Sequence, residues 1–117
     1  AVQSKKTYMK KVLAMWAEHL GGTSSVEGEY PAWAYKTDSK IRPIVVDTYK
    51  ELFGVEPKVT TIHAGLECGL FAGKLENLDC VSLGPDMVSI HSPNEKLSIA
   101  STQRTWELLK AILKNCK

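Results

Sequence analysis

The stretch Val59–Glu95 decides the fold of this 117-residue chain; it reads VTTIHAGLECGLFAGKLENLDCVSLGPDMVSIHSPNE. Its informative residues lie at its two ends, Ile62–Leu70 and Ile90–Glu95, with a short apolar run at Cys80–Pro85 between them. A β-rich run, a glycine turn and a short helical pattern open the stretch, and further runs of strand length follow. We expect both ends to face one active site, of which this chain supplies only part.

Outward from this stretch, segments of helical and of strand-like pattern follow one another along the chain. Helices are expected where apolar residues recur every three or four positions, and strands where β-branched residues gather between turn signals. This succession predicts a mixed α/β architecture. The expected elements are a helix over Ser4–Leu20, a strand over Thr23–Tyr30, a helix from Asp38 or Ser39 to Phe53, a strand over Lys58–His63, a short helix over Leu66–Phe71, strands over Asp79–Leu83 and Met87–Ile90, and a helix over Ser98–Asn115.

Each of the three long helices is expected to bury one apolar stripe in a core. Gly21 and Gly54 should end the first two, because glycine adopts the left-handed C-cap conformation without a Cβ penalty. Asp38 or Ser39 can cap the start of the second helix, and Pro43 is tolerated only in its first turn. The predicted stripes are Tyr8, Met9, Val12, Leu13, Trp16 and Leu20; Ile41, Ile44, Val45, Thr48, Tyr49 and Leu52; and Ile99, Trp106, Leu109, Ile112, Leu113 and Cys116.

Composition and charge are ordinary for a soluble globular domain. Apolar residues make up 44% and charged residues 24%, and the formal net charge of +2 predicts no strong attraction to nucleic acid or to an anionic membrane. No apolar run approaches the roughly 18 residues of a transmembrane helix, and the N-terminus lacks a signal-peptide pattern. Cys68, Cys80 and Cys116 form no C-x-x-C pair, so reduced thiols in a cytoplasmic protein are the simplest account.

Pro31–Tyr35 breaks the regular pattern and is the expected crossover between two structural units. The unit before it is too small to bury a core of its own unless more chain precedes it. We therefore predict two parts, residues 1–30 as the end of one domain and residues 31–117 as a segment of another.

His91 follows a predicted strand and precedes Ser92 and Pro93, so it should lie on a rigid loop. A neutral imidazole is a common zinc ligand, and the Glu95 carboxylate could orient the ring or hold the loop. Zinc needs three or four ligands, however, and no nearby residue completes the set. Without any family resemblance, a structural or surface role is the simpler interpretation of His91.

Gly65 lies where a predicted strand gives way to a helix. The backbone N–H groups of a helix start favour an anion such as a carboxylate, and a glycine lets a ligand approach the backbone closely. An ordinary tight turn is the alternative interpretation. His63 and Glu67 could shape the same pocket. Cys68 as a nucleophile would need a paired base such as His63, and their spacing indicates no such pairing.

The motifs together strongly resemble those of aminoacyl-histidine (Xaa-His) dipeptidases, which belong to a family of two-domain zinc aminopeptidases and carboxypeptidases that includes the carnosinases. The joint occurrence of three separated motifs is specific, although each alone would be weak. The resemblance covers most of the chain from about Glu29 on. The motifs are Ile62–Leu70, Val81–Pro85 and His91–Glu95, with further likeness at Tyr30–Trp33, Thr48–Phe53 and Trp106–Leu109.

The resemblance implies a C-terminal fragment of an α/β enzyme. Residues 31–117 would be the C-terminal portion of a phosphorylase/hydrolase-like mixed-sheet catalytic domain. Residues 1–30 would be the last helix and strand of an α+β lid domain of the dimerisation type. No catalytic residue is expected in this fragment.

The family's catalytic domain binds two metal ions, usually zinc, although other divalent metals also serve. Its ligands are two histidines, a bridging aspartate, a glutamate and a second aspartate, and another glutamate is the general base. The resemblance places the C-terminal histidine ligand on His91. It places the glycine whose backbone binds the substrate's terminal carboxylate on Gly65. His63 and Glu67 are expected to shape the pocket, and Glu95 to support His91.

The implied enzyme is a cytoplasmic hydrolase that cleaves small dipeptides of the Xaa-His, carnosine-like type, with a homodimer as one expected assembly. No nucleic acid or membrane partner is expected, and the fragment alone is expected to be inactive. The alternative is a non-catalytic module that binds small anionic peptides at the Gly65 turn without metal. A third interpretation, compatible with the first, is a lid-and-edge element whose exposed apolar faces drive dimerisation.

Overall fold

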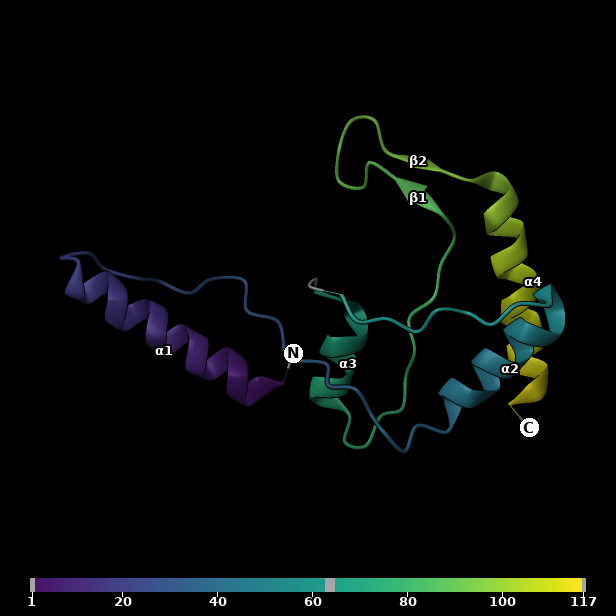
Figure 1. Cartoon of the computed structure of the whole chain (residues 1–117), viewed down its shortest axis with the longest axis horizontal. Coiled ribbons are helices and arrows are strands. Elements are labelled where there is room, and N and C mark those ends of the chain that lie inside the picture. The colour runs from purple at the N-terminus through teal and green to yellow at the C-terminus, as the bar shows by residue number, and fades with distance from the viewer. Residues whose placement is uncertain (1, 63–64, 117) are drawn as a thin grey trace. The chain divides into compact units, whose positions relative to one another are not determined.

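The computed structural model describes residues 2–62 and 65–116, which form four helices and two short strands (Figure 1). The mixed helix-and-sheet class expected from the sequence is confirmed. The elements are α1 (Gln3–His19), α2 (Ile41–Phe53), α3 (Glu67–Lys74), β1 (Met87–Val88), β2 (Lys96–Leu97) and α4 (Ile99–Asn115). They divide into two compact units, of which unit 1 is Ala1–Thr37 with Thr61–Asp79, and unit 2 is Asp38–Thr60 with Cys80–Lys117.

Helix α1 of unit 1 forms where the sequence predicted a helix. Gly21 has a left-handed φ of 79°, and the Gly22 N–H donates to the Ala17 carbonyl at 2.8 Å, so glycine ends the helix as expected. Its apolar stripe is not buried, since Tyr8 is 66% and Leu20 79% exposed. The expectation that this stripe packs in a core is therefore wrong for the described chain, because none of its elements covers that face.

Three predicted strands do not form in the part of the chain that the structure describes. The segments over Thr23–Tyr30, Lys58–Ile62 and Asp79–Leu83 are irregular. A strand forms only where a second backbone supplies hydrogen-bond partners. In the described residues the sheet consists of β1 paired with β2. The three segments have strand-like composition but no neighbouring strand in the described residues with which to pair. His63, at the end of the second segment, lies outside the described residues.

The core of unit 2 lies between α2 and α4, which pack side by side in Figure 1. Leu108 and Ile112 of α4 are 6% and 4% exposed, and Thr48 of α2 is 2% exposed. The Asn115 side-chain amide donates to the Thr48 hydroxyl at 2.9 Å, which satisfies the polar group that this packing buries.

The predicted apolar stripes of α2 and α4 are confirmed only in part. Thr48 and Ile112 are buried as expected, but Leu108, which the prediction omitted, shares the buried face of α4. Because α4 carries apolar residues on more than one side, periodicity alone could not identify the side that α2 covers. Members of the predicted stripes that are exposed in the structure include Leu52, Ile99, Trp106, Leu113 and Cys116.

The ends of α2 follow the local signals in the sequence. The Arg42 N–H donates to the Ser39 hydroxyl at 3.1 Å, so Ser39, one of the two expected caps, satisfies an N–H of the first turn. Pro43 lies in that first turn, where it displaces no helical hydrogen bond. Gly54 ends the helix with φ 70°. Short-range signals therefore define this element well.

Two further properties concern the described residues as a whole. No disulfide joins Cys68, Cys80 and Cys116. No helix among the described residues has both the length and the apolar character that crossing a membrane would require.

Candidate functional site

His91, the predicted metal ligand, lies in the loop that joins β1 to β2. The strands pair antiparallel with Met87 opposite Leu97, so residues 89–95 form the closed loop of a hairpin. Ser89 and His91 both have left-handed backbones, with φ of 53° and 64°. Few residues other than glycine adopt this conformation, and histidine is among those that do so more often. The predicted strand over Met87–Ile90 is thus confirmed only for its first two residues.

Hydrogen bonds within the loop fix its shape. The His91 N–H donates to Glu95 Oε2 at 2.7 Å, and the Ser92 hydroxyl donates to the Ser89 carbonyl at 2.7 Å. The Asn94 N–H in turn donates to the Ser92 hydroxyl at 3.2 Å. Of the two roles considered for Glu95, the structure shows the contact with the loop backbone.

The hairpin is joined to the start of α4 by a second set of hydrogen bonds. The Asp86 N–H donates to the Ser101 hydroxyl at 2.8 Å, and the Ser98 N–H donates to the Asp86 carbonyl at 3.0 Å. The Ser98 side chain also caps α4 by accepting from the Ser101 N–H at 3.3 Å. Ser101 is only 4% exposed, so the base of the hairpin is tied to a buried point of the helix.

We expect the Glu95→Ala substitution to loosen the His91 loop. Removal of the carboxylate leaves the His91 N–H without its acceptor, and amide exchange at His91 should become roughly tenfold faster, equivalent to about 1.4 kcal/mol. Hydrogen exchange followed by NMR measures this rate. Asn94→Ala is the matched control, because that loop residue contributes its backbone N–H and not its side chain. Equal exchange rates in both variants would contradict the assigned role of Glu95.

The donors around His91 do not form a complete metal site. Among the described residues there is no group of three or more His, Cys, Asp or Glu side chains that could hold a metal ion. Zinc sites in proteins use three or four such ligands. The His91 side chain is exposed and could supply one ligand of a larger set.

The Gly65 turn lies at the start of α3 in unit 1. Leu66 is the extended N-cap residue, and its side chain makes no capping hydrogen bond. The short helix predicted over Leu66–Phe71 is confirmed and continues to Lys74. A Cβ built on Gly65 would lie 3.0 Å from Cδ1 of Tyr30, so a side chain at this position would require the tyrosine ring to shift by a few tenths of an ångström. The expected reason for a glycine here was the close approach of a ligand, and the contact with the Tyr30 ring is an additional one.

The other residues predicted near the Gly65 pocket lie at or before the start of α3. Glu67 is exposed and Cys68 partly buried at the start of α3, whereas His63 lies outside the described residues. Gly65 belongs to unit 1 and His91 to unit 2. That both serve one active site therefore remains a prediction.

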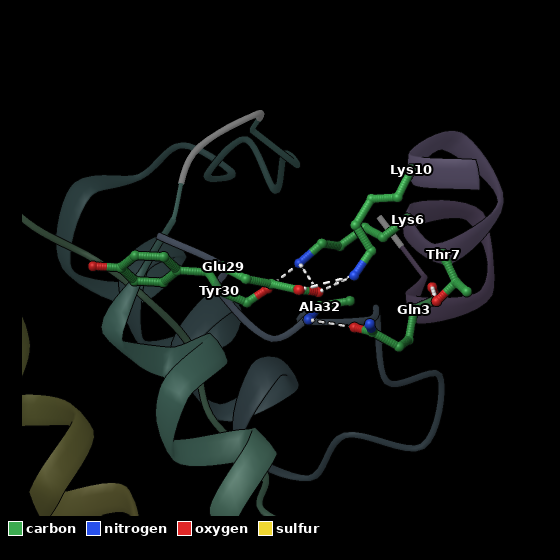
Figure 2. A network of polar contacts seen from close by, with 7 residues as sticks. All are labelled: Gln3, Lys6, Thr7, Lys10, Glu29, Tyr30 and Ala32. Carbon is green, nitrogen blue, oxygen red and sulfur yellow. Dashed lines mark hydrogen bonds and ion pairs between the residues drawn. The ribbon is translucent and has the colours of Figure 1, made fainter. Parts of the chain in front are cut away.

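A polar network joins α1 to the chain that precedes α2 (Figure 2). The Lys10 ammonium donates to Glu29 Oε2 at 2.8 Å, and the Lys6 ammonium donates to the Tyr30 carbonyl. The Ala32 N–H donates to the Gln3 side-chain oxygen at 3.2 Å. No signal in the sequence identified Glu29 as the partner of these lysines.

The Lys10 ammonium holds the pKa of Glu29 below its ordinary value of 4.5, first through its hydrogen bond and then through its charge. Loss of hydration raises this pKa in part, and the charge of Lys6 lowers it by a smaller amount. Because the pKa of the folded state is lowered, the ion pair stabilises the protein fully above pH 4.5. This contribution is lost as the pH falls through the lowered pKa.

We expect NMR titration of the Glu29 carboxyl to give a midpoint below 4.5, which Lys10→Gln should move back toward that value. Lys11→Gln is the matched control, since Lys11 is not among the groups that shift this pKa. An unchanged midpoint in Lys10→Gln would show that the Lys10–Glu29 pair does not form in solution.

Comparison with known proteins shows which family this chain resembles. The sequence model of peptidase family M20/M25/M40 matches residues 9–115. The cytosol non-specific dipeptidase of Escherichia coli is 37% identical over 113 residues, which cover 97% of this chain and 23% of that protein.

A solved structure agrees with this result. The crystal structure of aminoacylhistidine dipeptidase from Vibrio alginolyticus matches with a TM-score of 0.77 and 38% sequence identity, over 97% of this chain and 23% of that one. The chain thus spans less than a quarter of the length of either relative. The family inferred from the three motifs and the fold class inferred with it are both confirmed.

Proposed function

This chain belongs to peptidase family M20/M25/M40, and from that premise we propose that it is part of a metal-dependent dipeptidase. The observation that carries the proposal is its 37% identity, over nearly its whole length, to a protein named as a dipeptidase. The two similar proteins are named for non-specific and for aminoacylhistidine dipeptidase activity. We propose dipeptides of the Xaa-His, carnosine-like type as the substrates, which the name of the solved structure and its 38% identity to this chain support.

In this proposal His91 provides one ligand of a site for two metal ions, usually zinc. A metal ion bound there would act as a Lewis acid on the scissile carbonyl. The bond from the His91 N–H to Glu95 restricts the loop, which lowers the entropy that the imidazole loses when it binds metal.

Gly65 has a separate role in the proposal. Its backbone N–H, next to the start of α3, would bind the C-terminal carboxylate of the dipeptide, where the helix dipole favours negative charge. An enzyme that holds this carboxylate selects substrates by their length from the C-terminal end. Glu67 lies in the first turn of α3 and would border the same pocket.

The remaining parts of the proposal concern the longer protein. Three or four ligands are needed to retain zinc, so the 117-residue chain alone should have no dipeptidase activity. We also propose a cytoplasmic location, which the cytosol dipeptidase name of the relative supports, and a homodimer as the assembly.

Hydrolysis assays on the full-length protein test the proposal. With zinc present it should cleave an Xaa-His dipeptide and lose this activity to a chelator, with recovery when zinc is restored. The corresponding dipeptide amide, which lacks the terminal carboxylate, should be cleaved at least about a hundredfold less efficiently. If the protein binds the dipeptide in the presence of metal but does not hydrolyse it, the proposal of a dipeptidase is wrong. A non-catalytic peptide-binding module would then be favoured.

A further inference from the structure

Residues Glu29–Trp33, which we call the linking segment, contact two helices of unit 1. Toward α1 the segment makes polar contacts, in which Glu29 pairs with Lys10 at 2.8 Å and the Tyr30 carbonyl accepts from Lys6. In Figure 2 the ring of Tyr30 points away from these lysines. The backbone carbonyl of Tyr30 therefore contacts α1, whereas its ring is free to make a different contact.

Toward α3 the linking segment packs closely against two glycines. A Cβ on Gly69 would lie 3.2 Å from the Pro31 carbonyl oxygen, and one on Gly73 would lie 2.9 Å from Pro31 Cγ. Real Cβ atoms essentially never come as close as the second distance. Gly69 and Gly73 lie four residues apart on one face of α3, where Pro31 packs against them, and Gly65 lies just before the start of that helix.

The Tyr30 ring meets Gly65, just before the start of α3. A Cβ on Gly65 would lie 3.0, 3.1 and 3.2 Å from Cδ1, Cγ and Cε1 of the ring. One edge of the ring therefore packs directly against the Gly65 backbone. Tyr30 is 46% exposed, so this ring stands at the surface of the unit with one side covered.

From this contact we infer that Tyr30 is a positioning residue for the Gly65 turn, and that the linking segment couples α1 to the substrate-carboxylate site. The inference rests on the proposed function, in which the Gly65 N–H binds the carboxylate. Glycine has more backbone freedom than any other residue, so a binding group on glycine benefits from an external restraint. A tyrosine ring supplies that restraint at a low cost in side-chain entropy, since only two torsion angles become fixed.

Kinetics of Tyr30 variants in the full-length, metal-loaded protein test the positioning role. Tyr30→Ala should raise KM for an Xaa-His dipeptide by at least about tenfold, because misplacement by about 1 Å can have effects of a hundredfold. The loss should be much smaller for the dipeptide amide, which has no carboxylate to position. Tyr30→Phe keeps the ring and should restore the wild-type KM.

Two controls distinguish positioning from a general loss of structure. Tyr8→Ala removes a tyrosine that is 66% exposed on α1 and should leave both substrates unaffected. If Tyr30→Ala does not fold, Tyr30→Leu keeps apolar bulk without the planar ring and should show the same selective rise in KM. Equal losses for the dipeptide and its amide, or a Tyr30→Phe variant as impaired as Tyr30→Ala, would overturn the inference.

A double-mutant cycle tests the contact itself. Gly65→Ala should lower the thermal unfolding midpoint in wild type, because its methyl group meets the ring 3.0 Å away. The same substitution should have a smaller effect in the Tyr30→Ala background, where the ring is absent. Equal shifts in both backgrounds would show that Gly65 and Tyr30 do not pack together and would overturn the inference.

The two proposals fail in different ways. If the wild-type protein cleaves the dipeptide and its amide equally well, the carboxylate role of Gly65 in the proposed function is wrong. If the wild-type protein prefers the dipeptide and Tyr30→Ala keeps that preference, the site stands and Tyr30 does not position it.

Discussion

Replacing His91 with alanine in the full-length protein is expected to lower dipeptide hydrolysis by at least about a hundredfold. Mutation of a group that only supports a metal ligand lowers activity or metal affinity by about 10–100-fold. Loss of the ligand itself should have a larger effect. The left-handed backbone of His91 and the bond from its N–H to Glu95 fix the loop that carries the imidazole. Alanine at this position has no group that could bind metal in its place. Zinc content per chain should fall together with the activity.

Elemental analysis after dialysis with zinc, combined with initial-rate assays, measures both quantities. His19→Ala is the matched control, because His19 is an exposed histidine at the end of α1 and should retain wild-type zinc and activity. The same analysis on the 117-residue chain should find almost no zinc. A zinc ion that this chain retains and its His91→Ala variant loses would show that the site is complete without further residues, contrary to the proposal.

The second large effect is expected in the core of unit 2. Ile112 is 4% exposed between α2 and α4, so Ile112→Ala should lower the free energy of unfolding by about 2–5 kcal/mol through lost burial and the resulting cavity. Denaturant unfolding of the full-length protein, followed by circular dichroism, measures this change. A cost below about 1 kcal/mol would contradict the assignment of Ile112 to a packed core.

The neighbouring Leu113 is the matched comparison, since it is 65% exposed on the same helix. Leu113→Ala should have a much smaller effect if this side of α4 faces solvent in the full-length protein. An effect as large as that of Ile112→Ala would instead show that residues outside this chain cover the apolar side of α4.

Local sequence signals predicted the elements of this chain better than their packing. The hydrogen bond that Ser39 accepts from the Arg42 N–H and the end of α2 at Gly54 depend on groups a few residues apart, and both were found where the sequence placed them. Burial depends on what lies opposite a face. For this reason the buried Leu108 could not be distinguished from the exposed Trp106, two positions earlier, by sequence pattern alone.

The candidate site shows the same distinction. The loop around His91 is built from residues adjacent in sequence, and the contact of Glu95 with that loop was anticipated from their four-residue spacing. The contact between Tyr30 and Gly65 joins residues far apart along the chain, and neither residue indicates the other. The four-residue spacing of Gly69 and Gly73 marks a face of α3 that another segment can approach closely, but Gly65 lies before that helix and the spacing does not extend to it.

The division into two units has a genetic consequence. The chain passes from one unit to the other after Thr37, after Thr60 and after Asp79, so each unit is assembled from two separate stretches of sequence. Neither can be copied, fused or deleted as a single run of codons. A single insertion that shifts the reading frame between Thr60 and Cys80 would alter the later stretch of both units at once. Recombination should therefore preserve residues 38–79 as one stretch. Breakpoints should be tolerated more readily at the ends of that stretch than within it.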